Sequence, residues 1–270
     1  MRSHSELKQL LEEVTAKEYR LPEGIDTDKL ADDMLVWMGD TDLELRDKLI
    51  YSTFAELFDS KQFSPQQIKR ILYTAMDDKH LFHGIGEKGT DTVFMRAFSI
   101  LIIPIALDAN GETPFLSDEE VLHVKDTVLR YIREEQDTRG YVEEKGWAHA
   151  IAHGADALWA VAECDAVDAD SLKQVLAAIE TAIKKQRTAY GYEEDERLTT
   201  AFIEIYEREV LSLDDIKSWV KALASYDEEG QHHEVVSVKI SIKNFMRSVY
   251  FRLPEGDILA GFVRQYCNQR

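Results

Sequence analysis

Residues 117–160 read SDEEVLHVKDTVLRYIREEQDTRGYVEEKGWAHAIAHGADALWA and contain one complete unit of the chain's architecture. Ser117 followed three residues later by Glu120 is a capping-box pattern, which is typical of a helix N-terminus. Apolar residues recur at helical spacing after it, and Gly140 lies where the first helix would end. A second apolar segment begins at Trp147. This stretch therefore predicts two helices joined by a turn, a helical hairpin.

The same signals recur on both sides of this unit. Polar residues that can begin a helix lie at Ser64 (before Pro65), Ser117, Asp170 or Ser171, and Ser212. Turns of similar sequence contain Gly84, Gly140 and Gly191, which are 56 and 51 residues apart, and we expect these glycines to supply the left-handed conformation that stops a helix. Because a lone hairpin cannot bury its apolar faces, hairpins of about fifty residues must stack on one another.

These observations predict an all-α protein in which residues 1–270 form a single helical-repeat domain. Glycine (13 residues) and proline (5 residues) are scarce, and no low-complexity linker divides the chain. The Asp-rich turn and the arginine of residues 39–47 resemble a HEAT repeat, so we expect an open α/α superhelix of the HEAT type. The alternative is a stack closed into an α/α toroid.

Charge and composition exclude several classes of protein. The chain has 51 acidic and 32 basic residues, a net charge of −19, which disfavours nucleic acid and anionic membranes as partners. The longest apolar run, residues 97–107, is shorter than the ~20 residues that cross a bilayer, and residues 1–20 do not look like a secretory signal. The two cysteines, Cys164 and Cys267, offer no disulfide framework. We therefore expect a cytoplasmic protein.

Overlaying three second helices of the hairpins places polar residues in equivalent positions. The nine aligned residues are Thr92, Arg96 and Ser99, then His149, His153 and Asp156, then Thr200, Glu204 and Glu207. Positions i, i+4 and i+7 share one face of a helix, so each helix carries one polar stripe. In the middle helix the stripe is surrounded by alanine, isoleucine, leucine and tryptophan, as expected for an inner helix.

Polar groups on an inner helix need partners, because an unpaired buried polar group costs about 1–3 kcal/mol. The leading hypothesis is a binding protein whose polar inner groove holds a peptide, a partner protein or a small polar ligand. The alternative that needs no ligand also stays open: the stripes pair with each other and hold the hairpins in register.

The turns add further candidate ligand-binding residues at one edge of the stack. These are Arg139, Tyr141, Glu144 and Trp147, beside Glu87, Glu143, Tyr192, Glu193 and Glu194. Carboxylates beside aromatic rings suit a sugar or a cationic ligand. Glutamates in a first helical turn also stabilise the helix dipole without any ligand.

His149, His153 and Asp156 also have the spacing at which one helix face offers ligands to a divalent metal. The second hypothesis is therefore a hydrolase that depends on this metal, or on carboxylates such as Glu204 and Glu207. A zinc-protease motif is excluded, because Ala150 occupies the position of its catalytic glutamate.

Residues 139–156, RGYVEEKGWAHAIAHGAD, resemble the core of an uncharacterised bacterial family classed as a domain of unknown function. Residues 83–87 and 96–99 fit the same family. The resemblance implies a soluble, helical bacterial protein and no activity. Residues 152–155 faintly resemble the His-Gly turns of lanthionine-cyclase-like toroids, which bind zinc, but Ala152 lies where their cysteine ligand would be.

Overall fold

The structure, a computed structural model, describes residues 1–185, 190–227 and 232–267. Its elements, in chain order, are α1 (His4–Ala16), α2 (Thr27–Trp37), the π-helix η1 (Glu44–Tyr51), α3 (Ser52–Asp59), α4 (Pro65–Ala75), α5 (Thr92–Ser99), α6 (Ile102–Glu112), α7 (Asp118–Glu134), β1 (Tyr141–Val142), β2 (Gly146–Trp147), α8 (Ala150–Glu163), α9 (Ala169–Lys185), α10 (Glu194–Glu207), α11 (Leu213–Ala224), α12 (His232–Arg252), α13 (Ile258–Val263) and the 3-10 helix η2 (Arg264–Tyr266). The predicted all-α class is confirmed.

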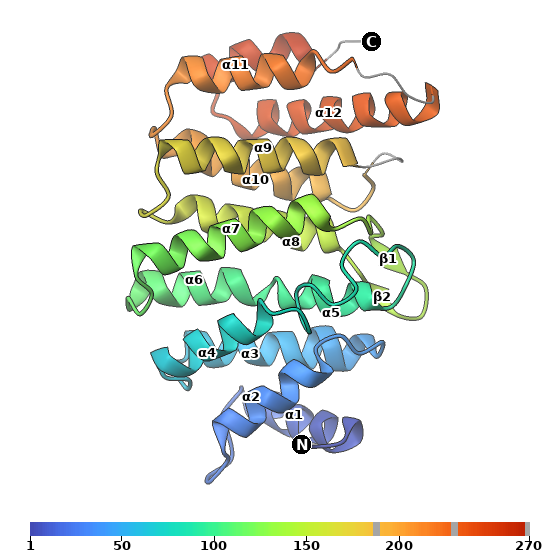
Figure 1. Cartoon of the computed structure of the whole chain (residues 1–270), viewed down its shortest axis with the longest axis vertical. Coiled ribbons are helices and arrows are strands. Elements are labelled where there is room, and N and C mark those ends of the chain that lie inside the picture. Colours follow the sequence, from blue (N-terminus) through green and yellow to red (C-terminus); the bar gives the residue numbers. More distant parts are fainter. Residues whose placement is uncertain (186–189, 228–231, 268–270) are drawn as a thin grey trace.

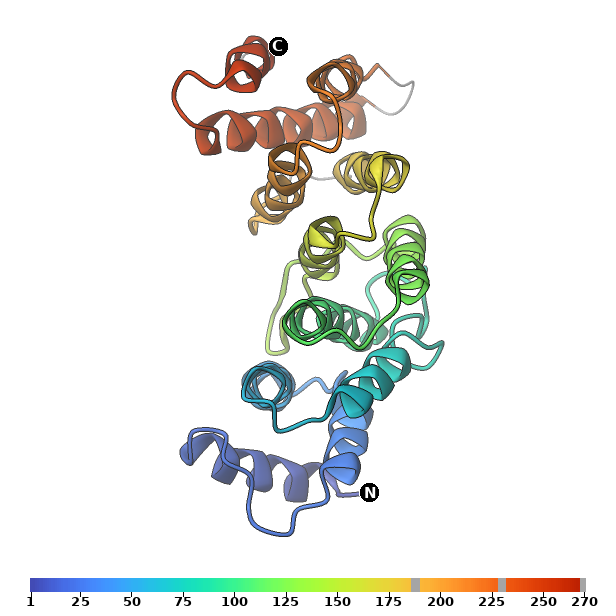
Figure 2. The ribbon, with the colours of Figure 1, turned by 90° about the vertical axis from the view of Figure 1, so that its left-hand side faces the viewer.

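The helices stack in chain order along the long axis of the molecule, and the two termini lie at opposite ends of it (Figure 1). Figure 2 shows two columns, with α4, α7 and α9 in one and α6, α8 and α10 in the other. Helices pack within each hairpin, as α7 does on α8, and between hairpins, as α8 does on α10. The chain therefore does not close into the alternative ring. Its likeness to HEAT repeats in particular stays a prediction.

Local capping begins the helices where the sequence predicted. Ser64 and Ser117 each form a complete capping box with the residue three positions later, and Ser212 accepts a hydrogen bond from the backbone of Asp215. The prediction for α9 was wrong by about two residues. Asp168, which accepts from the Ser171 backbone at 2.9 Å, lies immediately before this helix.

The predicted role of the turn glycines holds only at Gly84, which has a φ of +61°. Gly140 is not left-handed. It is required by a close approach instead, since a Cβ there would lie 2.0 Å from the ring of Tyr192. Neither explanation applies to Gly191, where a Cβ would meet no atom within 4 Å. The close approach of Tyr192 to Gly140 means that two turns distant in sequence pack directly on each other.

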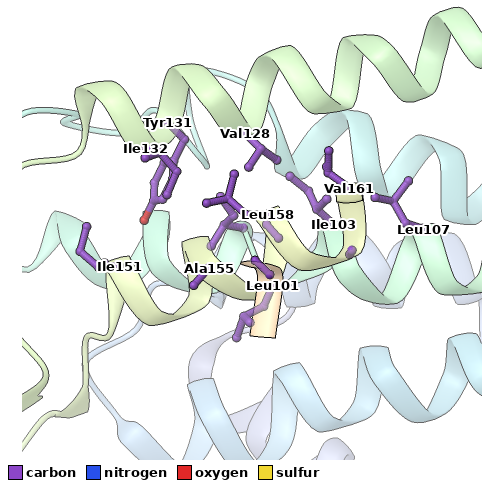
Figure 3. Packing of buried hydrophobic residues seen from close by; sticks show 14 of the residues in the cluster. Leu101, Ile103, Leu107, Val128, Tyr131, Ile132, Ile151, Ala155, Leu158 and Val161 are labelled. Carbon is purple, nitrogen blue, oxygen red and sulfur yellow. The ribbon is translucent and has the colours of Figure 1, made fainter. Parts of the chain in front are cut away.

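The helix α8 is the central element of the stack, as its small residues predicted. It packs against α5, α6, α7, α9 and α10. Figure 3 shows Ile151, Ala155 and Leu158 of α8 among apolar side chains of α6 and α7. A Cβ on Gly154 would lie 2.7 Å from Ile132, so glycine permits this close packing. The polar residues of α8 are therefore surrounded by a rigid apolar frame.

Residues 92–112, which include α5 and α6, form a helical stretch that is long and apolar enough to cross a membrane by length and composition. The stretch is longer than the apolar run considered from the sequence. Of its most apolar window, 67% is buried inside the fold, which is the behaviour of a core helix.

Candidate functional site

One pocket of about 630 Å³ receives the polar residues of α8. It lies between η1, β2, the N-terminal part of α8 and the turn that leads into α10. Its lining residues are Asp47, Tyr51, Leu101, Trp147, His149, His153, Asp156, Gly191, Tyr192, Glu193 and Arg197. The volume is in the range of sites for small molecules. Four predicted site residues, Trp147, His149, His153 and Asp156, are thus brought together.

The π-helix η1 supplies one wall of the pocket. Such helices are rare and frequently occur at functional sites. Asp47 and Tyr51, one turn apart on η1, both line the pocket. In the part of the chain that the structure describes, no group donates a hydrogen bond to the carboxylate of Asp47. Burial raises the pKa of this carboxyl, and burial together with the charge of Asp156 raises the pKa of Tyr51.

Arg46, also on η1, holds the β-hairpin that carries Trp147. Its guanidinium is fully buried over the ring of Phe94, 4.2 Å from the centroid. It donates to the carbonyl oxygens of Lys145 at 2.6 Å and Trp147 at 3.3 Å, and also to that of Asp40. Burial lowers its pKa to about 10, so the group is charged at neutral pH. Arg46 is therefore a positioning residue for the aromatic wall.

Aromatic rings line the opposite side of the pocket. Trp147 stacks on His149, with 4.2 Å between ring centroids and 25° between planes. Tyr192 meets Trp147 edge-on at 5.4 Å, and Tyr141 meets it at 5.1 Å from β1. Both tyrosines are nearly half exposed, so this wall faces the solvent side of the pocket.

His149 does not lie on the helix face as predicted. It precedes α8 as the N-cap residue, with a left-handed φ of +51° and no capping hydrogen bond from its side chain. The residue is 7% exposed, and its Nε2 has no hydrogen-bond partner. Burial lowers the pKa of the imidazole to about 4, so the ring is neutral at pH 7. A non-glycine residue in this conformation is strained, and such strain clusters at functional sites.

His153 lies one turn further, on the buried face of α8. Its Nδ1 is 2.8 Å from the carbonyl oxygen of Ala97. Since a carbonyl only accepts, Nδ1 carries the proton and Nε2 keeps a lone pair. The ring meets Phe98 and His149 edge-on at 5.3 and 5.7 Å. Burial lowers its pKa to about 3, so this imidazole is also neutral.

Asp156 completes the polar side of the pocket. Its carboxylate accepts a hydrogen bond from Arg197 of α10. Burial raises the pKa of Asp156 to about 6 although the charge of Arg197 opposes the shift. The pair joins two consecutive second helices, α8 and α10, at the pocket. The carboxyl group of Asp156 has a pKa close to neutral pH.

The predicted metal ligands are not arranged as expected. In the described ranges, no group of three or more His, Cys, Asp or Glu residues is placed to hold a metal ion. His149 is outside the helix and stacked on Trp147, and Asp156 is occupied by Arg197. The assumption that one helix face presents all three ligands was wrong, and the metal hypothesis itself stays a prediction.

Arg96 has a different environment from its counterpart His153. Its guanidinium is fully buried and donates to Glu135 at 2.6 and 3.1 Å. It also donates to the carbonyl oxygens of His83 and Gly84 and to the hydroxyl of Thr92. Arg96 therefore clamps the turns before α5 and after α7, and it does not line the pocket.

The remaining stripe residues lie elsewhere. Glu207 is exposed and lines a separate depression beside Leu211 and Leu253. Glu204 is partly buried, and its charge contributes to the raised pKa of Glu163. The overlay was wrong in expecting three stripes to share one hollow, because in the described structure only the stripe of α8 lines this pocket.

Three predicted turn residues surround the site without lining the pocket. Arg139 pairs with Asp137 at 2.7 Å and donates to the carbonyl oxygen of Thr90. Tyr141 packs on Trp147 from outside. Glu144 is exposed in the turn between β1 and β2, with a left-handed φ of +63°. Arg139 therefore holds the turn in place.

Sequence reasoning missed Asp47, Tyr51 and Arg197 as pocket residues. Asp47 is the last residue of the Asp-rich segment 39–47, which was interpreted only as a repeat signature, and Tyr51 lies four residues further on. Arg197 lies three residues before Thr200 on the same face of α10, so extending the stripe by one turn would have found it.

Part of the chain is similar to a known family of proteins. The family model of a protein of unknown function, DUF2785, matches residues 81–251. The chain belongs to this family, which confirms the resemblance to an uncharacterised domain. No curated protein and no solved structure matches the chain. The matched residues include α8 and Arg197, whereas Asp47 and Tyr51 come from the region before them.

Proposed function

We propose that this chain is a binding protein whose site is the pocket between η1, α8 and the turn before α10. The ligand is a small polar molecule, or a polar side chain that a peptide or partner protein inserts. The pocket combines the volume of a small-molecule site with aromatic rings and a few polar groups, which is the usual composition of such sites.

The observation that carries the proposal is the unpartnered Nε2 of His149. A buried polar atom without a partner costs about 1–3 kcal/mol, and native proteins contain few of them. The left-handed backbone of His149 adds to this cost. A ligand that hydrogen-bonds to the imidazole would recover the cost of the unpaired nitrogen. Structural pairing alone gives no reason for a strained residue with an open hydrogen-bonding atom beside a pocket.

The indole N–H resonance of Trp147 provides a direct test. Small polar probes of three kinds, amines, carboxylates and neutral sugars, are titrated into the isotope-labelled chain, and a Trp147→Phe variant assigns the resonance. The proposal predicts that at least one kind shifts the Trp147 resonance saturably while the resonance of Trp219, which is remote from the pocket residues, stays fixed. If no probe of any kind moves Trp147, the pocket is not a small-ligand site.

A second candidate is a hydrolase that uses His149, His153 and Asp156. The observation in its favour is the pKa of Asp156, which at about 6 suits a group that exchanges protons near neutral pH. Two neutral imidazoles in the same pocket could act as bases. A metal-dependent version would need a divalent ion, so elemental analysis of the untagged protein tests it: an equimolar metal supports this version and its absence from active protein removes it.

We infer that binding takes place in the cytoplasm of a bacterial cell. The absence of disulfide pairing in the sequence pattern and the resemblance to a bacterial family support this location. The strong negative charge supports a partner other than nucleic acid or an anionic membrane. Fractionation of cells that express the chain tests the location.

A further inference from the structure

We propose that the pocket selects a cation, an ammonium or guanidinium group that enters against Trp147 and is held by Asp47 and His149. This inference rests on the proposed function and specifies its ligand. The chemical class is an amine or guanidine with a free N–H. It can come from a small metabolite or from a lysine or arginine side chain of a peptide.

The charge of the side chains that line the pocket favours a cation. Three carboxylates, those of Asp47, Asp156 and Glu193, face one guanidinium, that of Arg197, which gives a net charge of −2 when all are ionised. Arg197 is paired with Asp156, and its charge also acts on His149 and His153. The carboxylate of Asp47 has no such partner among the described residues. The whole chain, at −19, adds a field that attracts cations.

Other charges near Asp47 do not fill this role. Arg46 precedes it on η1, and its guanidinium donates to the carbonyl oxygens of Lys145 and Trp147. The charges of Asp40 and Asp91 also act on Arg46. Lys48 is exposed, and no ion pair joins it to Asp47 in the described ranges. The pocket therefore retains a half-buried carboxylate that takes part in no ion pair in the described ranges, although the charges of Arg46 and Lys48 act on it.

His149 contributes a buried nitrogen that has no hydrogen-bond partner. At neutral pH the imidazole is uncharged, so burial beside a cation does not create repulsion. In the tautomer that carries its proton on Nδ1, the Nε2 of His149 accepts a hydrogen bond, and an ammonium or guanidinium has only donors to offer. His153 keeps an accepting Nε2 in the same pocket for the same reason. An anionic ligand would find two acceptors and two uncompensated carboxylates there.

The aromatic wall of the pocket also favours a cation. A cation over the face of a tryptophan is attracted by the ring more strongly than over tyrosine or phenylalanine. His149 stacks on one face of Trp147, Tyr192 meets the ring edge-on, and Trp147 also lines the pocket. Because the ring is already held, a ligand would lose little affinity to ordering it.

The test compares L-argininamide with L-citrullinamide, which has nearly the same shape but no guanidinium charge. The Trp147 indole resonance reports binding at pH 7.5. We expect L-argininamide to bind at least about tenfold more tightly than L-citrullinamide, a difference of about 1.4 kcal/mol. The variant Asp47→Asn should reduce that preference at least about fivefold, and Glu207→Gln, on a separate surface, should leave it unchanged.

The outcomes separate this inference from the proposed function. Equal binding of the two amides, or saturable binding of a carboxylate probe alone, overturns the cation inference and leaves the binding site standing. Failure of every probe to move Trp147 overturns both. An acetylated Gly-Arg-Gly amide, added as a further arm, supports a peptide source if it binds more tightly than L-argininamide and a small-molecule source if it binds less tightly. Circular dichroism of Asp47→Asn checks that the variant is folded.

Discussion

Arg96 of α5 and His153 of α8 occupy equivalent positions on consecutive second helices, yet their surroundings differ completely. The guanidinium of Arg96 is saturated by Glu135, Thr92 and three backbone carbonyls. Around His153 the polar groups are only partly satisfied, and the neighbouring His149 has an open nitrogen. The same sequence position thus serves structure in one hairpin and borders a pocket in the next. The two roles differ in whether the buried polar atoms all have hydrogen-bond partners, as at Arg96, or do not, as at His149 beside His153.

The largest effect should come from breaking the saturated cluster. Glu135→Ala leaves the charge of Arg96 buried without its partner, and we expect a loss of about 3–5 kcal/mol in the free energy of unfolding. Urea denaturation measures it. Glu134→Ala is the control, because its pair with Arg130 is largely exposed and is worth less than about 1 kcal/mol. Equal losses for the two variants would contradict the contrast.

The next effect tests how the two regions are joined. Arg46→Met removes the hydrogen bonds to the carbonyl oxygens of Lys145 and Trp147, and we expect a loss of about 2–3 kcal/mol. Hydrogen exchange should accelerate in residues 141–147 more than in α10. If the hairpin amides keep their protection, Arg46 does not position the aromatic wall.

Acid should destabilise the open region through its histidines. The folded pKa values of about 4 for His149 and 3 for His153 lie below the ordinary value of 6.5. Between these limits the unfolded chain binds protons that the folded chain does not, so stability is full above about pH 6.5 and falls with decreasing pH. The raised pKa of Asp156, about 6, acts oppositely: its stabilising contribution is present below about pH 4 and is lost as pH rises through 6.

Unfolding curves at pH 7.0 and 5.0 test these signs. His149→Phe should lose roughly 2 kcal/mol less than the wild type between the two pH values, and Asp156→Asn should lose more than the wild type. Identical profiles for the wild type and His149→Phe would show that His149 is not buried in its neutral form.

The parts of the fold that depend on neighbouring residues could be predicted from the sequence. The helix caps at Ser64 and Ser117 need only the next three residues. The small residues of α8 indicate an inner helix. The β-hairpin of residues 141–147 could not be predicted, because Arg46, about a hundred residues earlier, holds it. The π-helix η1 has the apolar spacing of any helix and gave no separate signal.

The candidate site was predicted in part for the same reason. Trp147, His149, His153 and Asp156 lie close in sequence and do line one pocket. Asp47 reaches it from η1, and nothing local indicates that it faces α8. Arg197 reaches it from α10 and could have been found only by extending the polar stripe of that helix by one turn. The alignment of stripes assumed that equivalent positions share an environment. Glu135, whose position after α7 brings it to Arg96, made that assumption wrong.

The smallest expected change concerns the unpartnered nitrogen of His149 as a ligand-binding group. The free energy of unfolding of the wild type and His149→Phe is measured at pH 7.5, each with and without L-argininamide. Phenylalanine keeps the ring that stacks on Trp147 and removes the unpartnered nitrogen, so the account predicts a variant about 1 kcal/mol more stable than the wild type that gains nothing from L-argininamide, while the wild type is stabilised by it. A less stable variant, together with a wild type that L-argininamide does not stabilise, would contradict the account.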